Sequence, residues 1–362
     1  MGRTRDDNQE TAGGLARELG CLPLALEQAA AYIERIGGGC AGYLARYRRQ
    51  GLKLLEKAEL STDYPKTVAT TWQLSFEAVK AEEPASAELL KAVSFLVPDS
   101  IPIEIFTLGG SKLGDLLADK LTGAREDPLA FWEVLEPLER YSLVDRLADS
   151  SFRIHRLTQE VIKDFLGEGG RRDWAERVVG ALNAAYPWSE PKTWPLCERL
   201  QPHAWAASEL IRSFDLDSVE AGRLLAQAGV YAWERGGYGE ARLFGEHALE
   251  IRDRVLGVEH PNTLRSRTNL ASLLYSLDDL EAAREFAEQV LEAQERLLGT
   301  EHPETSIALW ILLKTVQRLG DTEAVEQLIG KLRWLLGRDE ASIASARQRE
   351  IRRDLLDMLN GA

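Results

Sequence analysis

The sequence predicts a mainly α-helical protein that ends in a solenoid of repeated helical hairpins. An eight-residue segment beginning at Leu256 returns at Leu298, an offset of 42 residues. Over most of the chain, apolar residues recur at the three-to-four-residue spacing of one helix face. Strand patterns are indicated only within residues 141–155. These observations favour helical domains followed by an α-solenoid, with one small mixed domain between them.

The composition indicates a globular protein of two or three domains. Its 362 residues are 44% hydrophobic and 28% charged, as in ordinary folded domains. The 58 acidic residues exceed the 44 Lys and Arg residues, so the formal net charge is −14. An acidic surface repels phosphate backbones, which disfavours nucleic-acid binding.

Other features indicate a cytoplasmic protein without a membrane partner. No apolar window approaches the roughly 20 residues that span a membrane. Residues 1–10 are polar and acidic, unlike a signal peptide. Cys21, Cys40 and Cys197 are widely spaced and contain no C-x-x-C, so they fit reduced thiols better than disulfides or a zinc site.

Residues 1–60 are predicted to form a helical domain. Two apolar stripes run through Thr11–Ile36, and Gly20-Cys21-Leu22-Pro23 separates them. Pro23 suits the first turn of the second helix, because the N–H that proline lacks would have no helical partner there. From the residues alone, this segment is a helical hairpin.

Residues 61–166 are predicted to form a winged-helix-like domain. Helices are expected at Ala85–Phe95 and near Leu135–Leu138, and strands at Tyr141–Val144 and Ser151–His155. Helix, strand, turn and strand in this order are the outline of a winged helix.

Residues 167–214 are predicted to hold a linker and packing helices. Gly167–Gly170 has the composition of a flexible linker, and an amphipathic helix follows it. Trp188, Trp194 and Trp205 have two interpretations. They either form a binding surface or, as we prefer, pack the winged helix against the first repeat, since large aromatic residues dominate buried contacts.

Residues 215–338 contain three hairpin units at the 42-residue offset, of which the middle one is the clearest. In that unit Asp278-Asp279 forms the turn between two apolar faces, and the small residues Ala271 and Ala283 mark where its helices approach closely. A single hairpin cannot bury its apolar face, so neighbours must stack and leave a concave groove. In residues 339–362, a helix over Ser342–Leu359 should cap the stack with Ile343, Ile351, Leu355, Leu356 and Leu359.

The repeated residues resemble the kinesin-light-chain type of tetratricopeptide repeat. The resemblance covers about a third of the chain and is carried by His260-Pro261-Asn262-Thr263, Asn269-Leu270-Ala271, Ala282-Ala283 and Leu298-Gly299. The first unit departs from the pattern at Gln227-Ala228-Gly229 and the third at Ile311-Leu312-Leu313. The resemblance implies that a protein or peptide binds in the groove.

Four residues of these units invite a functional interpretation. Arg265 and Asn269, on the first helix of the middle unit, either face the groove and contact a partner or lie on the solvated outer face. His260 and His302 occupy the same turn of successive units, before a proline that begins a helix. We therefore interpret both histidines as structural turn residues and not as metal ligands.

The N-terminal half resembles STAND (NB-ARC-type) signalling ATPases. Gly14–Leu26 is similar to the Gly-Leu-Pro-Leu-Ala segment of that family, in which the proline, here Pro23, lines the adenine site; Cys21 replaces the usual glycine. His155 matches the histidine of the family's Met-His-Asp element, which senses the nucleotide phosphates. Ile154 and Arg156 replace its other two residues. The alternative is that His155 only caps the following helix.

The phosphate loop of that family is missing from this sequence. No G-x-x-x-x-G-K-[ST] occurs, and Gly109-Gly110-Ser111-Lys112 has the wrong order and spacing. Gly37, Gly39 and Gly42 satisfy G-x-G-x-x-G but follow a helix, so we interpret them as a helix-terminating loop. We expect no ATPase activity from this chain. We expect ADP or ATP to bind only with an upstream nucleotide-binding core, and we expect the chain to be a fragment, an engineered piece or a remnant.

These features lead to two hypotheses of different class. The first is the regulatory and sensor region of a STAND-type signalling protein, which binds a partner in the repeat groove and relays it through the winged helix. The alternative is a winged-helix DNA-binding regulator with a repeat sensor domain. A DNA reader should concentrate Lys and Arg on its recognition helix, whereas the helices of residues 66–165 are mixed in charge. Oligomerisation is left open.

Overall fold

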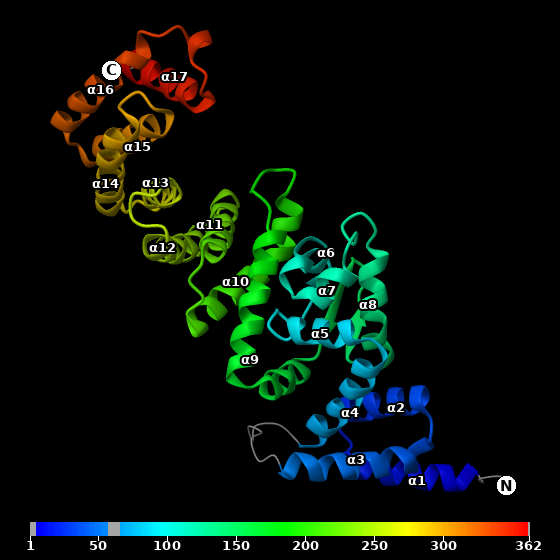
Figure 1. Ribbon diagram of the computed structural model, residues 1–362. Coiled ribbons are helices and arrows are strands. Elements are labelled where there is room, and N and C mark those ends of the chain that lie inside the picture. The colour runs from blue at the N-terminus through cyan, green and yellow to red at the C-terminus, as the bar shows by residue number, and fades with distance from the viewer. Residues whose placement is uncertain (1–4, 57–65, 361–362) are drawn as a thin grey trace. The chain divides into compact units, whose positions relative to one another are not determined.

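The computed structural model (Figure 1) describes residues 5–56 and 66–360. They form two compact units, which are taken separately below. The N-terminal unit comprises the described residues up to Pro187 together with Glu198–Leu216, and the repeat unit comprises Trp188–Cys197 together with the described residues from Asp217. Helices dominate both units, so the predicted mainly α fold class is confirmed. The predicted boundary at residue 60 lies outside the described residues, and the other domain limits remain predictions.

The N-terminal unit begins with four helices. They are α1 (Arg5–Glu18), α2 (Pro23–Ile36), α3 (Gly39–Glu56) and α4 (Lys66–Glu82). Pro23 is the first residue of α2, as its missing N–H predicts. Gly39 and Gly42 lie inside α3, so the predicted helix-terminating loop is confined to Gly37 and Gly38.

A three-stranded antiparallel sheet follows within the same unit. The order along the chain is α5 (Pro84–Val93), β1 (Ile101–Pro102), α6 (Glu104–Gly109), η1 (Gly110–Lys112), α7 (Asp115–Lys120), α8 (Leu129–Arg140), β2 (Val144–Arg146) and β3 (Ser151–Ile154). The sheet order is β1-β3-β2, with Ile101 opposite Phe152 and Val144 opposite Ile154. The first strand of the hairpin begins at Val144, at the end of the predicted 141–144 segment.

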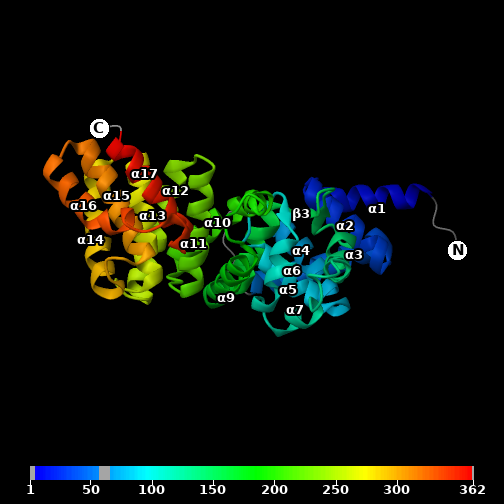
Figure 2. The same ribbon diagram turned by 90° about the horizontal axis from the view of Figure 1, so that it is seen from above.

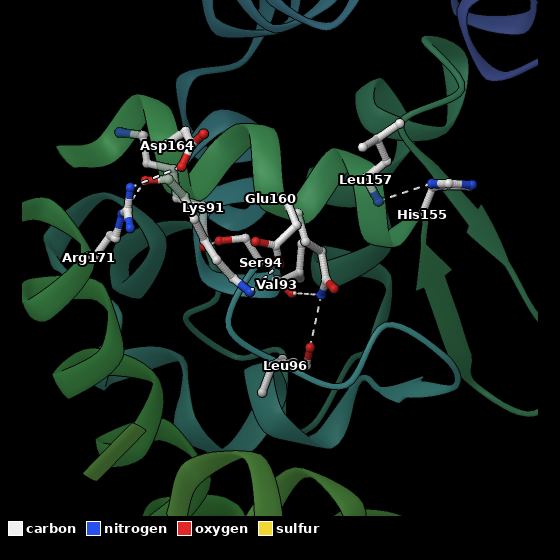
Figure 3. Close-up of polar contacts among 11 residues, drawn as sticks. Lys91, Val93, Ser94, Leu96, His155, Leu157, Glu160, Asp164 and Arg171 are labelled. Atoms are coloured by element: carbon white, nitrogen blue, oxygen red, sulfur yellow. Dashed lines mark hydrogen bonds and ion pairs between the residues drawn. The ribbon is translucent and has the colours of Figure 1, made fainter. Parts of the chain in front are cut away.

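The segment predicted as a flexible linker, Gly167–Gly170, lies within α9 (Arg156–Ala185), where two helical stretches join across a kink. Gly167 alone leaves helical geometry, with φ 64° and ψ 177°, and kinks the helix there. Arg171 fastens the two halves together by donating to the Lys163 carbonyl at 2.8 Å and to Asp164 at 3.0 Å (Figure 3). The buried Gln159 ties α9 to the end of α5 by donating to the carbonyl oxygens of Val93 and Leu96, each at 2.9 Å.

The repeat unit is built from three helical hairpins followed by one more helix (Figure 2). The first repeat is α11 (Val219–Glu234) with α12 (Tyr238–Val255), the second is α13 (Pro261–Ser276) with α14 (Leu280–Leu298), and the third is α15 (Pro303–Leu319) with α16 (Thr322–Leu336); η2 (Glu340–Ser342) and α17 (Ala346–Asn360) follow. The long helix α10 (Trp194–Phe214) precedes them. Its residues divide between the two units.

The repeat frame follows the 42-residue offset closely. Ala241, Ala271 and Ala283 are buried, with exposed fractions of 2% or less. Their burial agrees with the close helix approach that these small residues predict. Each hairpin turn contains one residue with positive φ, at Gly236, Asp278 and Gly320. These three positions are 42 residues apart.

The predicted capping helix is largely as expected. Ile343, Ile351 and Leu355 are buried against the third repeat. Gln348 adds a hydrogen bond to the Ser306 hydroxyl at 2.9 Å. Leu359 is 42% exposed, so its predicted capping role is wrong: it lies in the last turn of α17, next to the end of the helix.

Candidate functional site

A cavity of about 360 Å³ lies on the repeat unit, where the first and second repeats meet. Helices α11, α12 and α13 line it together with the segment that precedes α10. The lining residues are Trp188, Ser189, Val219, Arg223, Ala226, Gln227, Val230, Arg252, Leu256, Asn262, Arg265 and Asn269. We call it the repeat cavity.

Both sequence-predicted partner-binding residues line the repeat cavity. Arg265 and Asn269 are four residues apart on α13, which places them on one face of that helix. Arg265 is exposed and Asn269 is half-buried. Both residues therefore lie on the repeat cavity, and their contact with a partner stays a prediction.

Arg252 is the residue of this cavity that the sequence analysis missed. Its side chain is 8% exposed, and its guanidinium donates to the Asn262 carbonyl at 3.0 Å and to the Ser266 hydroxyl at 2.6 Å. Burial, together with the positive charges of Arg265 and Arg223, lowers the pKa of Arg252 to about 10. Both hydrogen-bond partners are neutral, so neither compensates this charge.

The charge of the repeat cavity is one-sided. It contains three arginines, and none of its lining residues carries a carboxylate. Burial also lowers the pKa of Arg223, whose guanidinium lies 5.5 Å from the centroid of the Trp188 ring. In a chain with a formal charge of −14, the cavity is thus a local concentration of positive charge.

Trp188 corrects one prediction from the sequence. The indole is 55% exposed and lines the repeat cavity, so the preferred packing interpretation is wrong for this residue. Its segment is held on the first repeat by Glu234, which accepts hydrogen bonds from the Ser189 hydroxyl and, at 3.1 Å, from the Trp194 indole N–H. An anchored segment with an exposed indole is suited to contact a ligand.

A second cavity, of about 480 Å³, lies within the N-terminal unit. It is lined by Leu24, Glu27, Asp99, Ser142, Leu143, Val144, Asp145, Arg153, Ile154, His155 and Arg156. His155 and Leu24, the residue after Pro23, therefore line the same cavity, whereas Pro23 is exposed beside it at the start of α2.

His155 caps α9, as the structural alternative predicted. Its Nδ1 accepts a hydrogen bond from the Leu157 backbone N–H at 3.1 Å (Figure 3). His260 and His302 cap α13 and α15 in the same way, at 3.1 and 3.2 Å. An accepting Nδ1 requires the neutral tautomer with its proton on Nε2. Capping thus occupies one ring nitrogen and leaves Nε2–H as a donor.

Charged side chains of the N-terminal cavity pair with one another. Its two arginines already face carboxylates: Arg153 lies 2.9 Å from Asp145, and Arg156 lies 3.7 Å from Asp99. The cavity thus combines both signs of charge, unlike the repeat cavity. Within the described part of the chain, no group of three or more His, Cys, Asp or Glu residues could hold a metal ion.

Comparison with known proteins identifies the repeats. A tetratricopeptide repeat model matches residues 220–296 and 269–333. A model described as a domain of unknown function, DUF7779, matches residues 77–170.

A nucleotide-binding leucine-rich repeat (NLR)-like protein of Hyaloscypha variabilis is 29% identical over 273 residues, which cover 71% of this chain. The chain spans about a quarter of that protein, 26% of its length. The crystal structure of BtubC (BKLC) from P. vanneervenii is 16% identical, covers 67% of this chain and 88% of that one, and has a TM-score of 0.37.

The C-terminal part of the chain therefore consists of tetratricopeptide repeats. Together with the NLR-like relative, these repeats support a role in protein interaction or signalling. Among the helices of residues 5–56 and 66–360, none has the length and apolar character needed to cross a membrane.

Proposed function

We propose that this chain is the sensor and regulatory region of a STAND-type signalling protein and that it binds a protein partner through the repeat cavity. The observation that carries the proposal is the cavity itself, which gathers Arg265, Asn269, Arg252 and the exposed Trp188 at the junction of two tetratricopeptide repeats. Stacked repeats of this kind create extended binding surfaces. The 29% identity to an NLR-like protein supports the signalling context.

The N-terminal unit would relay partner binding. Residues 84–154 follow the order helix, strand, three α-helices, strand and strand, with an antiparallel sheet ordered β1-β3-β2. We propose that this is a winged helix used as a structural piece. The helix before the strand hairpin, α8, carries Glu133, Glu136 and Glu139. These charges give the DNA-binding alternative no support, because they would repel a phosphate backbone.

Nucleotide chemistry would belong to another part of the system. The N-terminal cavity has no unpaired arginine for phosphates, so Pro23 and His155 would act only as flanking contacts to a core supplied elsewhere. The Nε2–H of His155, fixed as a donor by the cap, is the group that would reach such a phosphate. We therefore propose that the isolated chain does not hydrolyse ATP.

The test is selection of random linear peptides displayed on phage against the purified chain, followed by fluorescence anisotropy with the selected peptides. The double variant Arg265→Ala with Asn269→Ala should weaken binding about tenfold or more, since charge-assisted and neutral hydrogen bonds are lost together. Arg333→Ala is the matched control, because Arg333 is an exposed helical arginine outside the cavity. Failure to select any peptide, or equal binding by the double variant, would contradict the proposal.

A further inference from the structure

Arg252 lacks the counter-ion that other arginines of the repeat unit possess. The ion-paired arginines are Arg242, Arg254, Arg267, Arg284, Arg296, Arg318, Arg338, Arg347, Arg352 and Arg353. Among the described residues, Arg252 and Arg265 have no carboxylate within ion-pair distance. A nearly buried cation with only neutral partners is costly, because buried charges are normally paired. The repeat unit therefore holds a nearly buried cation that has no carboxylate partner among the described residues.

The arrangement of positive charge suits one compact anion of high charge. Arg223 and Arg265 occupy equivalent positions of α11 and α13, 42 residues apart. Both lie close enough to Arg252 on α12 for their positive charges to lower its pKa. A carboxylate carries one negative charge and two oxygens. A phosphate monoester carries a charge of about −1.5 to −2 at neutral pH and three acceptor oxygens at a single point. Guanidinium forks match those oxygens in pairs.

The surroundings of the arginines suit a peptide that carries such a group. The cavity, at about 360 Å³, is larger than a phosphate group. Trp188, Val219 and Leu256 line it with apolar surface, and the first two are 55% and 47% exposed. Gln227 and Asn269 add amide groups, which can bond to the backbone of an extended chain.

We propose that the repeat cavity binds a phosphorylated serine or threonine of a partner protein, with Arg223, Arg252 and Arg265 around the phosphate and Trp188 against a neighbouring apolar residue. This inference rests on the proposed function and specifies its ligand. A kinase reaction would then supply the phosphorylated partner and permit binding. A phosphatase reaction would remove the phosphate and end the interaction.

The test uses three fluorescent peptide libraries with the same degenerate flanks around a fixed central phosphoserine, glutamate or serine. Anisotropy at pH 7.5 and low salt should show the phosphoserine library binding about tenfold or more tightly than the glutamate library. Arg265→Ala should remove most of that preference, and Arg333→Ala should leave it intact. Arg265 is exposed and makes no ion pair within the described chain, so its replacement does not threaten the fold. Lowering the pH from 7.5 to 5.5 should weaken phosphoserine binding, because the second phosphate pKa is about 6.

The outcomes separate the inference from the proposed function. Equal binding of the glutamate and phosphoserine libraries, or binding of the serine library alone, overturns the phosphate assignment and leaves peptide binding standing. Binding of free phosphoserine or inorganic phosphate as tightly as the peptide also overturns it, because the site would then serve a small molecule. If no library binds and phage selection fails as well, the proposed function falls with it.

Discussion

The junction between the first and second repeats differs in chemistry from the junction between the second and third, although the frame is the same. The 42-residue offset carries Arg252 to Gln294, Arg265 to Ile307 and Asn269 to Ile311. Glu304 takes the place of Asn262. Ile311 is 4% exposed and belongs to a core cluster with α17 residues. The second junction is thus less cationic, and the third repeat packs against the C-terminal helix α17. The first junction instead holds an open cavity lined by three arginines.

The frame positions, by contrast, repeat in all three hairpins. Arg254 pairs with Asp217, Arg296 with Glu259 and Arg338 with Glu301, and each pair spans 37 residues within one hairpin. Histidine caps begin α13 and α15, and a positive-φ residue occupies each turn. The side chains at the junctions therefore vary on a fixed frame, and we interpret the deviations from the repeat as candidate functional positions.

The largest effect is expected from making the first junction resemble the second. The double variant Arg252→Gln with Arg265→Ile removes two of the three guanidiniums and should weaken phosphopeptide binding about a hundredfold, on the order of one tenfold step for each lost charge. Anisotropy measures the loss. The helical circular dichroism spectrum should not change, since Gln294 and Ile307 occupy the equivalent helical positions. Undiminished binding would place the ligand elsewhere.

The next effect concerns the frame, which should respond equally at both junctions. His260→Ala and His302→Ala each remove the acceptor of an N-cap hydrogen bond and should lower the free energy of unfolding by about 1 kcal/mol. Urea denaturation measures both, with His260→Asn and His302→Asn as cap-preserving controls. Losses that differ several-fold between the two sites would break the claim of a common frame.

Arg252→Gln alone should stabilise the unligated chain by about 1 kcal/mol while weakening ligand binding. Burial lowers the pKa of Arg252, so the folded protein disfavours its charge, and we expect this cost to exceed the two hydrogen bonds of about 1 kcal/mol each. The sign follows from the pKa: below about pH 10 the folded state holds a proton that it binds less tightly than the unfolded state does. A loss of stability in urea denaturation at pH 7 would show that Arg252 is a structural residue.

The smallest effect concerns the one turn that departs from glycine. Asp278 has φ 65°, whereas Gly236 and Gly320 occupy the equivalent turns. Asp278→Gly should raise the free energy of unfolding by about 0.5 kcal/mol, because a left-handed conformation costs an L-residue about 1 kcal/mol and the lost ion pair with the exposed Arg318 is worth less. Gly320→Ala is the opposite control and should be destabilising. A destabilised Asp278→Gly would show that this turn depends on its side chain.

Sequence reasoning succeeded where a pattern was repeated. The hairpins, the turn at Asp278-Asp279 and the start of α2 at Pro23 all follow from apolar spacing, proline chemistry and the 42-residue offset. Strand β1 was not predicted, because it has only two residues and one of them is a proline. The glycines at 167–170 suggested a linker, but a single glycine absorbs the kink while Arg171 bridges the two halves of α9.

The burial of Arg252 was not predicted, for a different reason. A charged residue in an amphipathic helix is normally assigned to the solvent, and its burial depends on how α11 and α13 pack around it. A signal was nevertheless present, because Arg252, Gln294 and Leu336 align at the 42-residue offset, and an arginine in the same column as a leucine is unusual. The sequence analysis singled out Trp188 as a large aromatic residue, but only the structure shows its exposed ring beside Arg223.

The central claim is that the ligand binds at the junction of the first two repeats. Hydrogen–deuterium exchange of the purified chain, with and without a saturating phage-selected peptide, locates the site directly. Protection confined to α11, α12, α13 and the segment around Trp188, and lost in the Arg252→Gln/Arg265→Ile variant, is the predicted result. Protection that falls instead on α15–α17, or on the N-terminal unit alone, would contradict the account.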